Sequence, residues 1–170
     1  MDRTLYRKIV TYVPLFRQLS PQELESVIGI SRLLKVKRGT TIIKEGEQGT
    51  AMYIMVEGKA RVFKRLQNNE LTQLADLEAP SVFGEMALID RSPRSASVGT
   101  LTDTILYQVD LSEFNKLREA YHPAAYKVLR ELAPLICARL RQINDRIGDF
   151  FQNPHEEAEE LQVLTPKESL

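Results

Sequence analysis

The stretch that decides the fold is FGEMALIDRSPRSASV, at residues 83–98. It interrupts a series of β-prone segments with one helical turn over 85–89, a loop that holds Pro93, and then another strand. A glycine before a helix start exposes backbone N–H groups to an anion, and Gly84 lets a ligand approach the backbone. Arg94 can grip two phosphate oxygens at once with its planar guanidinium. The stretch therefore predicts an anion site.

Glu85 is the unusual member of this stretch, because a carboxylate beside a phosphate site repels the ligand. It suits a phosphate that is attached to a sugar, since a carboxylate accepts hydrogen bonds from sugar hydroxyls. Gly84, Glu85 and Arg94 together indicate a pocket for a ribose phosphate. From the residues alone, Glu85 and Arg94 can equally form a salt bridge that fixes a loop.

Short β-prone runs lie on both sides of the helical turn, and turn residues separate them. They cover residues 33–36, 41–43, 52–56, 60–66, 71–77, 95–100 and 104–109. Glycines stand in several gaps, for example at Gly39, Gly46 and Gly58, where turns often need a positive φ. Many short strands at even spacing predict a mainly β chain, folded as an antiparallel sandwich or roll.

The residues before the β region show the helical period instead. Leu5, Ile9 and Val13 predict a first helix that ends at Pro14. The sequence SPQE at 20–23 has the form of a second helix start, with serine as N-cap, proline at the first position and glutamate reaching back to the cap.

After the strands, the spacing predicts a short helix over 111–119 and a long one over about 123–151. The long helix carries an apolar stripe typical of a coiled-coil seam, formed by Leu129, Leu132, Ile136, Leu140, Ile143, Ile147 and Phe150. Pro134 lies inside it and is expected to kink or locally break it.

These patterns divide the chain into four segments. They are an N-terminal helical segment (1–30), a β-roll (31–110), C-terminal helices (111–152) and an acidic tail (153–170). The tail is rich in glutamate and then polar, and we expect it to be disordered.

The composition fits one globular domain. The chain has 170 residues, of which 43% are hydrophobic and 27% charged. Lys and Arg number 23, as do Asp and Glu, so the formal net charge is zero. A protein that coats nucleic acid or an anionic membrane normally has a basic surplus, and this composition argues against that class.

Cysteine usage and the absence of long apolar runs indicate a soluble, cytoplasmic protein. The single cysteine, Cys137, excludes an intrachain disulfide framework. Since it sits in the apolar run LICA at 135–138, we expect a buried, inert thiol.

Enzymatic and metal-binding interpretations find little support in the residues. The only histidines, His122 and His155, flank a helix start or lie in the tail, and we expect both at the surface. No Walker-type loop, nucleophile elbow or HExxH motif occurs. The chain is therefore predicted to be no enzyme and to need no metal or cofactor.

Residues 83–98 resemble the phosphate-binding cassette of the cyclic nucleotide-binding domain family. The family pattern is apolar-Gly-Glu-x-small-apolar, a short variable loop and then Arg-(Ser/Thr/Ala)-Ala, which FGEMAL at 83–88 and RSA at 94–96 match at every position. Residues 42–58 resemble a second pattern of the family, a turn-strand-turn whose glycines hold the β-roll. The resemblance covers about residues 14–147 and implies a β-roll (double-stranded β-helix or jelly roll) with flanking helices.

The resemblance also implies roles for single residues. Glu85 would accept the ribose 2′-hydroxyl, and Arg94 would pair with the cyclic phosphate. Backbone N–H groups of the cassette and Ser95 would complete the phosphate cradle, whereas Gly46, Gly49 and Gly58 would be structural. The implied ligand-binding set is Gly84, Glu85, Met86, Ala87, Arg94, Ser95, Ala96 and Asn144.

In the family, the helix after the roll caps the base, and in dimeric bacterial activators it also forms the dimer seam. The pair Arg139-Leu140 resembles one in the activator helix, and counting from it puts Asn144 near the base. There Asn144 can hydrogen-bond an adenine edge, although an ordinary exposed helix asparagine is the competing interpretation.

The function that the resemblance implies is a stand-alone cyclic nucleotide sensor without enzymatic activity. Ser95 favours cyclic AMP over cyclic GMP, because relatives that prefer cyclic GMP more often carry threonine at or beside this position. A homodimer through the long helix and an unidentified effector protein are the expected partners. Only 20 residues follow Phe150 and they are acidic, so we expect no DNA-reading domain. The alternatives are a scaffold with a non-functional pocket, or a sensor for cyclic GMP or another nucleotide.

Overall fold

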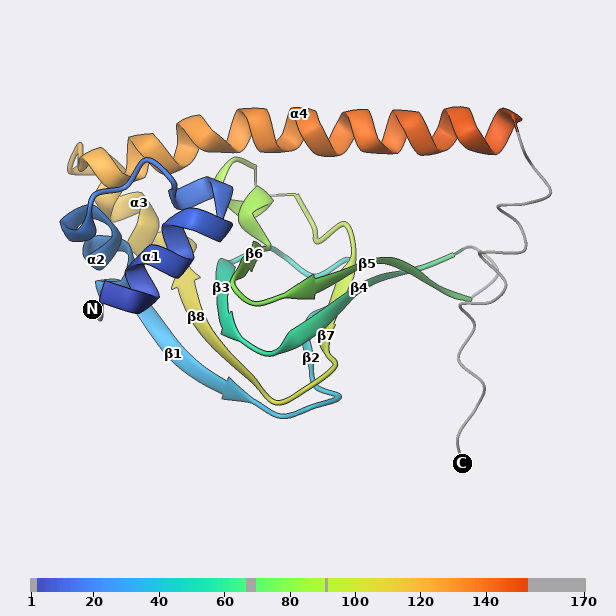
Figure 1. The fold of residues 1–170 in the computed structure, drawn as a ribbon, viewed down its shortest axis with the longest axis horizontal. Coiled ribbons are helices and arrows are strands. Elements are labelled where there is room, and N and C mark those ends of the chain that lie inside the picture. The colour runs from blue at the N-terminus through green and yellow to red at the C-terminus, as the bar shows by residue number, and fades with distance from the viewer. Residues whose placement is uncertain (1–2, 67–69, 91, 153–170) are drawn as a thin grey trace.

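The computed structural model describes residues 3–66, 70–90 and 92–152. Two four-stranded antiparallel sheets form the centre, in the orders β1-β8-β3-β6 and β2-β7-β4-β5 (Figure 1). The strands are β1 (Ser31–Val36), β2 (Thr41–Ile43), β3 (Ala51–Glu57), β4 (Lys59–Arg65), β5 (Leu71–Glu78), β6 (Ser81–Phe83), β7 (Ser97–Thr100) and β8 (Thr104–Asp110). The prediction of a mainly β roll with flanking helices is confirmed.

Helical segments flank the roll at one end and along one side (Figure 1). They are α1 (Arg3–Tyr12), the 3₁₀ turn η1 (Pro14–Phe16), α2 (Pro21–Gly29), the 3₁₀ turn η2 (Glu85–Leu88), α3 (Leu111–Glu119) and α4 (Pro123–Gln152). The start of α2 is the predicted capping box. Ser20 Oγ accepts from the Glu23 amide at 3.3 Å, and Glu23 Oε2 accepts from the Ser20 amide at 2.7 Å.

The strand boundaries differ from the predictions around the deciding stretch. β6 was not expected, and β7 begins at Ser97 rather than at residue 95. The reason is a local pairing with the turn after β2. The Arg94 amide donates to the Glu47 carbonyl at 2.8 Å, and the Gly46 amide donates to the Arg94 carbonyl at 2.9 Å. These bonds hold Arg94 against that turn, outside the ladder of β7.

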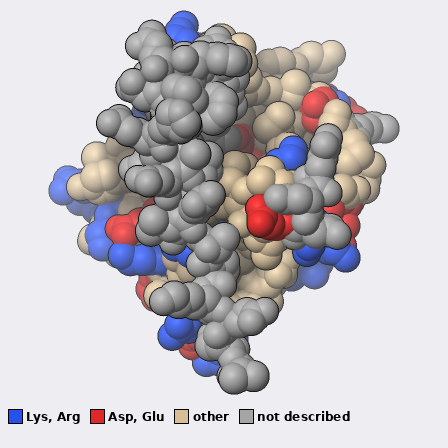
Figure 2. Space-filling model, turned by 90° about the vertical axis from the view of Figure 1, so that its right-hand side faces the viewer, with Lys and Arg blue, Asp and Glu red and all other residues tan. Residues whose placement is uncertain are grey.

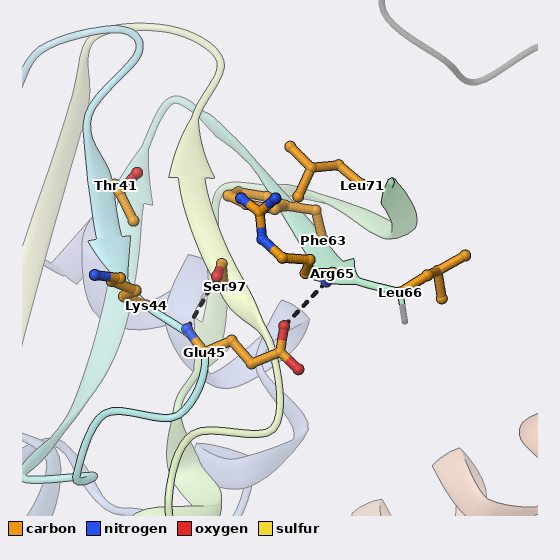
Figure 3. A pocket seen from close by; sticks show the side chains of 8 residues that line it. All are labelled: Thr41, Lys44, Glu45, Phe63, Arg65, Leu66, Leu71 and Ser97. Carbon is orange, nitrogen blue, oxygen red and sulfur yellow. Dashed lines mark hydrogen bonds between the residues drawn. The ribbon is translucent and has the colours of Figure 1, made fainter. Parts of the chain in front are cut away.

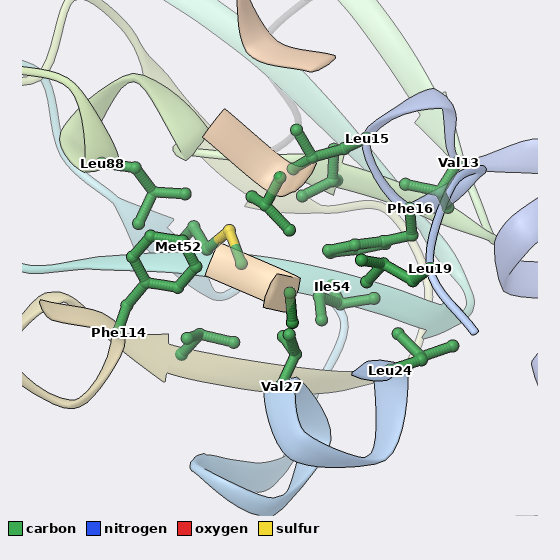
Figure 4. Close-up of a cluster of buried hydrophobic side chains, with 14 of the residues drawn as sticks. Val13, Leu15, Phe16, Leu19, Leu24, Val27, Met52, Ile54, Leu88 and Phe114 are labelled. Atoms are coloured by element: carbon green, nitrogen blue, oxygen red, sulfur yellow. The ribbon is translucent and has the colours of Figure 1, made fainter. Parts of the chain in front are cut away.

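The apolar side chains form two buried clusters. The inner cluster lies between the two sheets and includes Ile43, Phe83, Val98 and Leu106. The larger cluster lies between the helices and the sheet that contains β3 and β8 (Figure 4). Leu88, at the end of η2, belongs to the larger cluster together with Leu132 of α4. The central turn and the long helix therefore share one core.

The helix α4 begins in the core and then extends along and beyond the roll (Figure 1). Its first turns bury Ala124, Ala125, Val128 and Leu132. Lys127 donates to Glu23 Oε2 at 2.7 Å, which ties α4 to the capping box of α2. No helix in the described part of the chain combines the length and the apolar character that crossing a membrane requires.

Two features of α4 differ from the expectations. The helix continues through Pro134 without the local break that was one of the two expected outcomes. Because Pro134 and Arg130 are both exposed, water can hydrate the carbonyl that proline leaves without a donor. Cys137 is exposed rather than buried. Its apolar neighbours Leu135 and Ile136 are partly buried, whereas Cys137 and Ala138 lie on the outer face.

Candidate functional site

The candidate site is the segment from Gly84 to Ala96, which connects β6 with β7. Its first part is held by η2, whose N-cap is Gly84, and its last part by the pairing of Arg94 with the turn after β2. An isolated bridge between Gln48 and Pro93 extends this pairing. Two turns that lie far apart in the sequence therefore frame one site.

Gly84 is required at its position for two reasons. Its φ is 73°, in the left-handed region that side chains disfavour. A Cβ there would also lie 2.9 Å from Arg94 Nη1 and 3.0 Å from Ile43 Cδ1. Since Ile43 belongs to the inner cluster, Gly84 and Arg94 meet on the inner side of the roll.

Glu85 is the first residue of η2 and is almost fully buried, with 1% of its surface exposed. Ala87 and Leu88 are also buried, whereas the Met86 side chain is 44% exposed. Burying a carboxylate is costly unless the surroundings stabilise it, and such a group is typical of a site with a specific task. The structure thus places Glu85 at the start of η2 and out of bulk water, a burial that the sequence did not predict.

The Arg94 guanidinium connects two elements through their backbones. Nη1 donates to the Gly84 carbonyl at 3.1 Å, and Nη2 donates to the Ala51 carbonyl at the start of β3. Burial lowers the pKa of Arg94 below its ordinary value, and the neighbouring Tyr53 and Glu85 partly oppose this effect. The guanidinium stays charged, so the site holds a partly desolvated positive charge beside a buried carboxylate.

Two residues beside Arg94 were not predicted to belong to the site. Gly49 is buried, and a Cβ there would lie 3.1 Å from Ala87 Cβ and 3.5 Å from Arg94 Cζ. Tyr53 of β3 stacks on Phe83 with ring centroids 5.3 Å apart. Burial raises the pKa of the Tyr53 phenol, and the Arg94 charge partly opposes this rise. Gly49 could have been found from sequence, because it follows Gly46 by three residues in the family-like turn. Tyr53 could not, because nothing in its type or position distinguishes it from other strand residues.

The remaining predicted ligand-binding residues are less well defined by the structure. Ser95 is exposed and Ala96 is partly buried. Asn144 lies in α4, but its side chain is outside the described part of the structure. The structure therefore brings Gly84, Glu85, Ala87 and Arg94 together and leaves the role of Asn144 a prediction.

A cavity of about 580 Å³ lies among residues of β2, β4, β5 and β7 and the turn after β2 (Figure 3). It is lined by Thr41, Lys44, Glu45, Phe63, Arg65, Leu66, Leu71 and Ser97. Ser97 pairs with Phe63, and Val98 with Val62 in the next register position. Because successive side chains alternate between faces and Val98 belongs to the inner cluster, Ser97 and Phe63 face outward. The cavity is separate from the Glu85 and Arg94 site.

The described residues contain no cluster of three or more histidine, cysteine, aspartate or glutamate side chains that could hold a metal ion. His122 instead caps α4, since its Nδ1 accepts a hydrogen bond from the Ala124 amide at 3.2 Å. His155 lies outside the described residues.

The chain is similar to known proteins in sequence and in fold. Residues 33–121 match the family model of the cyclic nucleotide-binding domain. A cAMP-dependent protein kinase regulatory subunit from Mycosarcoma maydis is 33% identical over 161 residues, which are 92% of this chain and 28% of that protein. The cyclic AMP receptor protein of Thermus thermophilus is 31% identical over 129 residues, which are 76% of this chain and 58% of the relative.

A solved structure shows the same arrangement of strands and helices. The catabolite activator protein of Thermus thermophilus superposes with a TM-score of 0.70 at 29% sequence identity, covering 79% of this chain and 62% of the other. The kinase regulatory subunits are much longer than this chain, which spans little more than a quarter of the Mycosarcoma maydis protein.

Proposed function

Because the chain belongs to the cyclic nucleotide-binding domain family, we propose that residues 84–96 bind a cyclic nucleotide, with cyclic AMP preferred. The observation that carries the proposal is the pair of opposite charges in one cassette. Glu85 is buried at the start of η2, and the Arg94 guanidinium lies close enough to feel its charge. A ribose phosphate presents hydroxyl donors to the first residue and anionic oxygens to the second.

The position of Arg94 explains why binding of an anion to the site is favourable. The guanidinium has five N–H donors, and its hydrogen bonds to Gly84 and Ala51 leave donor capacity for phosphate oxygens. Burial already disfavours its charged form, so a phosphate replaces missing water with a charge-assisted hydrogen bond. The backbone of η2 supplies further donors near Met86 and Ala87.

The preference for cyclic AMP is the finer part of the proposal. It is supported by Ser95, which directly follows Arg94 and is exposed where a ligand can reach it. The relative from Thermus thermophilus that is 31% identical is called a cyclic AMP receptor protein, which agrees with this preference. The base contact proposed for Asn144 would add an adenine-specific hydrogen bond.

Calorimetric titration tests the binding proposal directly. The purified chain is first shown to be free of nucleotide and is then titrated with cyclic AMP and cyclic GMP. Micromolar or tighter binding of cyclic AMP, with weaker binding of cyclic GMP, is the expected result. A reversed preference would overturn the role of Ser95. If neither nucleotide shows measurable binding, the proposal is overturned. That result would favour a scaffold whose pocket is closed by the two carbonyl contacts of Arg94.

We further propose that the sensor has no catalytic activity of its own and relays binding through α4 to a protein partner. The support is the shared core, since Leu88 of η2 and Leu132 of α4 lie in one buried cluster. A ligand that shifts η2 therefore changes the surface on which α4 rests, which biases the position of the helix. A homodimer through α4, a cytoplasmic location and the absence of direct DNA contact remain predictions. Light scattering and a DNA mobility assay test the first and the last.

A further inference from the structure

Surface charge does not single out a phosphate site in this chain. The formal net charge is zero, and Figure 2 shows basic and acidic side chains next to one another at the end of the molecule toward which β4 and β5 point. The affinity of the cassette for an anion therefore depends on how its few buried donors are placed. Residues that fix this placement serve the function even where they touch no ligand.

Gly49 is a glycine because of the space around it and not because of its backbone angle. Gly46 and Gly84 have positive φ values of 82° and 73°, whereas the φ of Gly49 lies outside that region. Gly49 is buried, and a Cβ on it would lie 3.1 Å from Ala87 Cβ. Carbon atoms that touch without strain are about 3.5–4.0 Å apart. One of these two Cβ positions must therefore stay empty for the turn after β2 to lie against η2.

The empty position at Gly49 also faces Arg94. A Cβ there would lie 3.5 Å from both Cζ and Nε of Arg94, which is ordinary contact. Nη1 of the same guanidinium would lie 2.9 Å from a Cβ on Gly84. The two glycines thus leave room for the guanidinium at the place where the turn meets the cassette.

Both sides of this contact are held in place. The turn is tied to the cassette, since the Arg94 amide donates to the Glu47 carbonyl at 2.8 Å. On the other side, Ala87 is buried, and its neighbour Leu88 belongs to the larger buried cluster. A Cβ at position 49 therefore has no open space to enter, and it would displace η2 together with its backbone N–H groups.

We propose that Gly49 and Ala87 form a spacing pair, in which the missing Cβ of Gly49 makes room for the methyl group of Ala87. The pair sets the distance between the turn after β2 and η2. It thereby sets the positions of the Arg94 guanidinium and of the N–H groups of η2. Gly49 is a positioning residue, because it acts through Ala87 and Arg94. The inference rests on the proposed binding of a cyclic nucleotide to the cassette.

A double-mutant cycle on the full chain tests the spacing pair by calorimetry with cyclic AMP. Gly49→Ala should weaken binding about tenfold, the equivalent of ~1.4 kcal/mol. In the Ala87→Gly variant the opposing methyl group is gone, so Gly49→Ala should cost little there, because residues in contact show non-additive effects. Gly29→Ala is the matched control and should leave the affinity unchanged, since a Cβ there meets open space. Urea denaturation shows that each variant is folded under the titration conditions.

The outcomes separate this inference from the proposed function. If the unsubstituted chain binds and Gly49→Ala costs the same affinity with and without Ala87→Gly, the spacing pair alone is overturned. If the unsubstituted chain does not bind, the proposed function is overturned and this inference with it. If Gly49→Ala by itself does not fold, the double variant should still fold and bind as Ala87→Gly does. A double variant that fails to do so would contradict the spacing pair.

Discussion

Arg94 should contribute most of the phosphate affinity, because its half-buried guanidinium meets the anion with little competing water. Arg94→Ala should weaken cyclic nucleotide binding by about 2–5 kcal/mol, the scale for losing one partner of a buried charge pair. Arg94→Lys should recover only part of this loss, since lysine lacks the planar fork. Calorimetry measures both. Arg61→Ala is the control, because Arg61 pairs with Asp76 on the surface. Unchanged affinity in both Arg94 variants would contradict the assignment.

Gly84 allows a sharp test of backbone geometry. Gly84→Ala should destabilise the fold by at least about 1–2 kcal/mol, because alanine is strained at its positive φ and its Cβ would collide with Arg94 and Ile43. Gly29→Ala is the matched control. No atom lies within 4 Å of a Cβ there and the residue is helical, so alanine should be neutral or slightly stabilising. Urea denaturation compares the two variants, and equal stability would remove the argument for strain.

At the scale of elements, the junction of α2 and α4 should make stability depend on pH. The hydrogen bond from Lys127, followed by that from the Ser20 amide, lowers the pKa of Glu23. A lowered pKa in the folded state means that the stabilisation is present above the unfolded pKa. The stabilisation is lost as the pH falls through the pKa that Glu23 has in the folded state. The urea midpoint should therefore drop in mildly acid solution, and Glu23→Gln should flatten this dependence. Glu119→Gln, at an exposed position at the end of α3, is the control.

Elements also show what can be foreseen from sequence and what cannot. The capping box at Ser20 and the turn at Glu85 were predicted correctly because their signals are local. β6 has three residues, too few for a period to show. The partners of Arg94 are the backbone carbonyls of Gly84 and Ala51. Because every residue has a backbone carbonyl, the sequence does not reveal which ones accept these hydrogen bonds. The sequence could thus point to Glu85 and Arg94 as candidates, but it could not show the contacts that hold Arg94.

At the scale of the whole molecule, the part of α4 beyond the core predicts self-association. Leu140 is 56% exposed on this projecting helix and belongs to the apolar stripe of the sequence. Leu140→Glu should shift a dimer toward monomer in light scattering, since it places a charge in the expected seam. Arg141→Gln, one residue further and about 100° around the helix, is the control. A monomeric unmodified chain at high concentration would contradict the dimer.

The inward orientation of Arg94 has a consequence for proteolysis. Trypsin must take an arginine side chain into its specificity pocket, but this guanidinium is held by two carbonyls inside the roll. The bond after Arg94 should therefore be cut slowly, although Ser95 is exposed, whereas Arg38 is exposed in the turn between β1 and β2 and leaves its bond open to attack. A timed digest would thus record how often the site opens, in a protein that carries no label and no substitution.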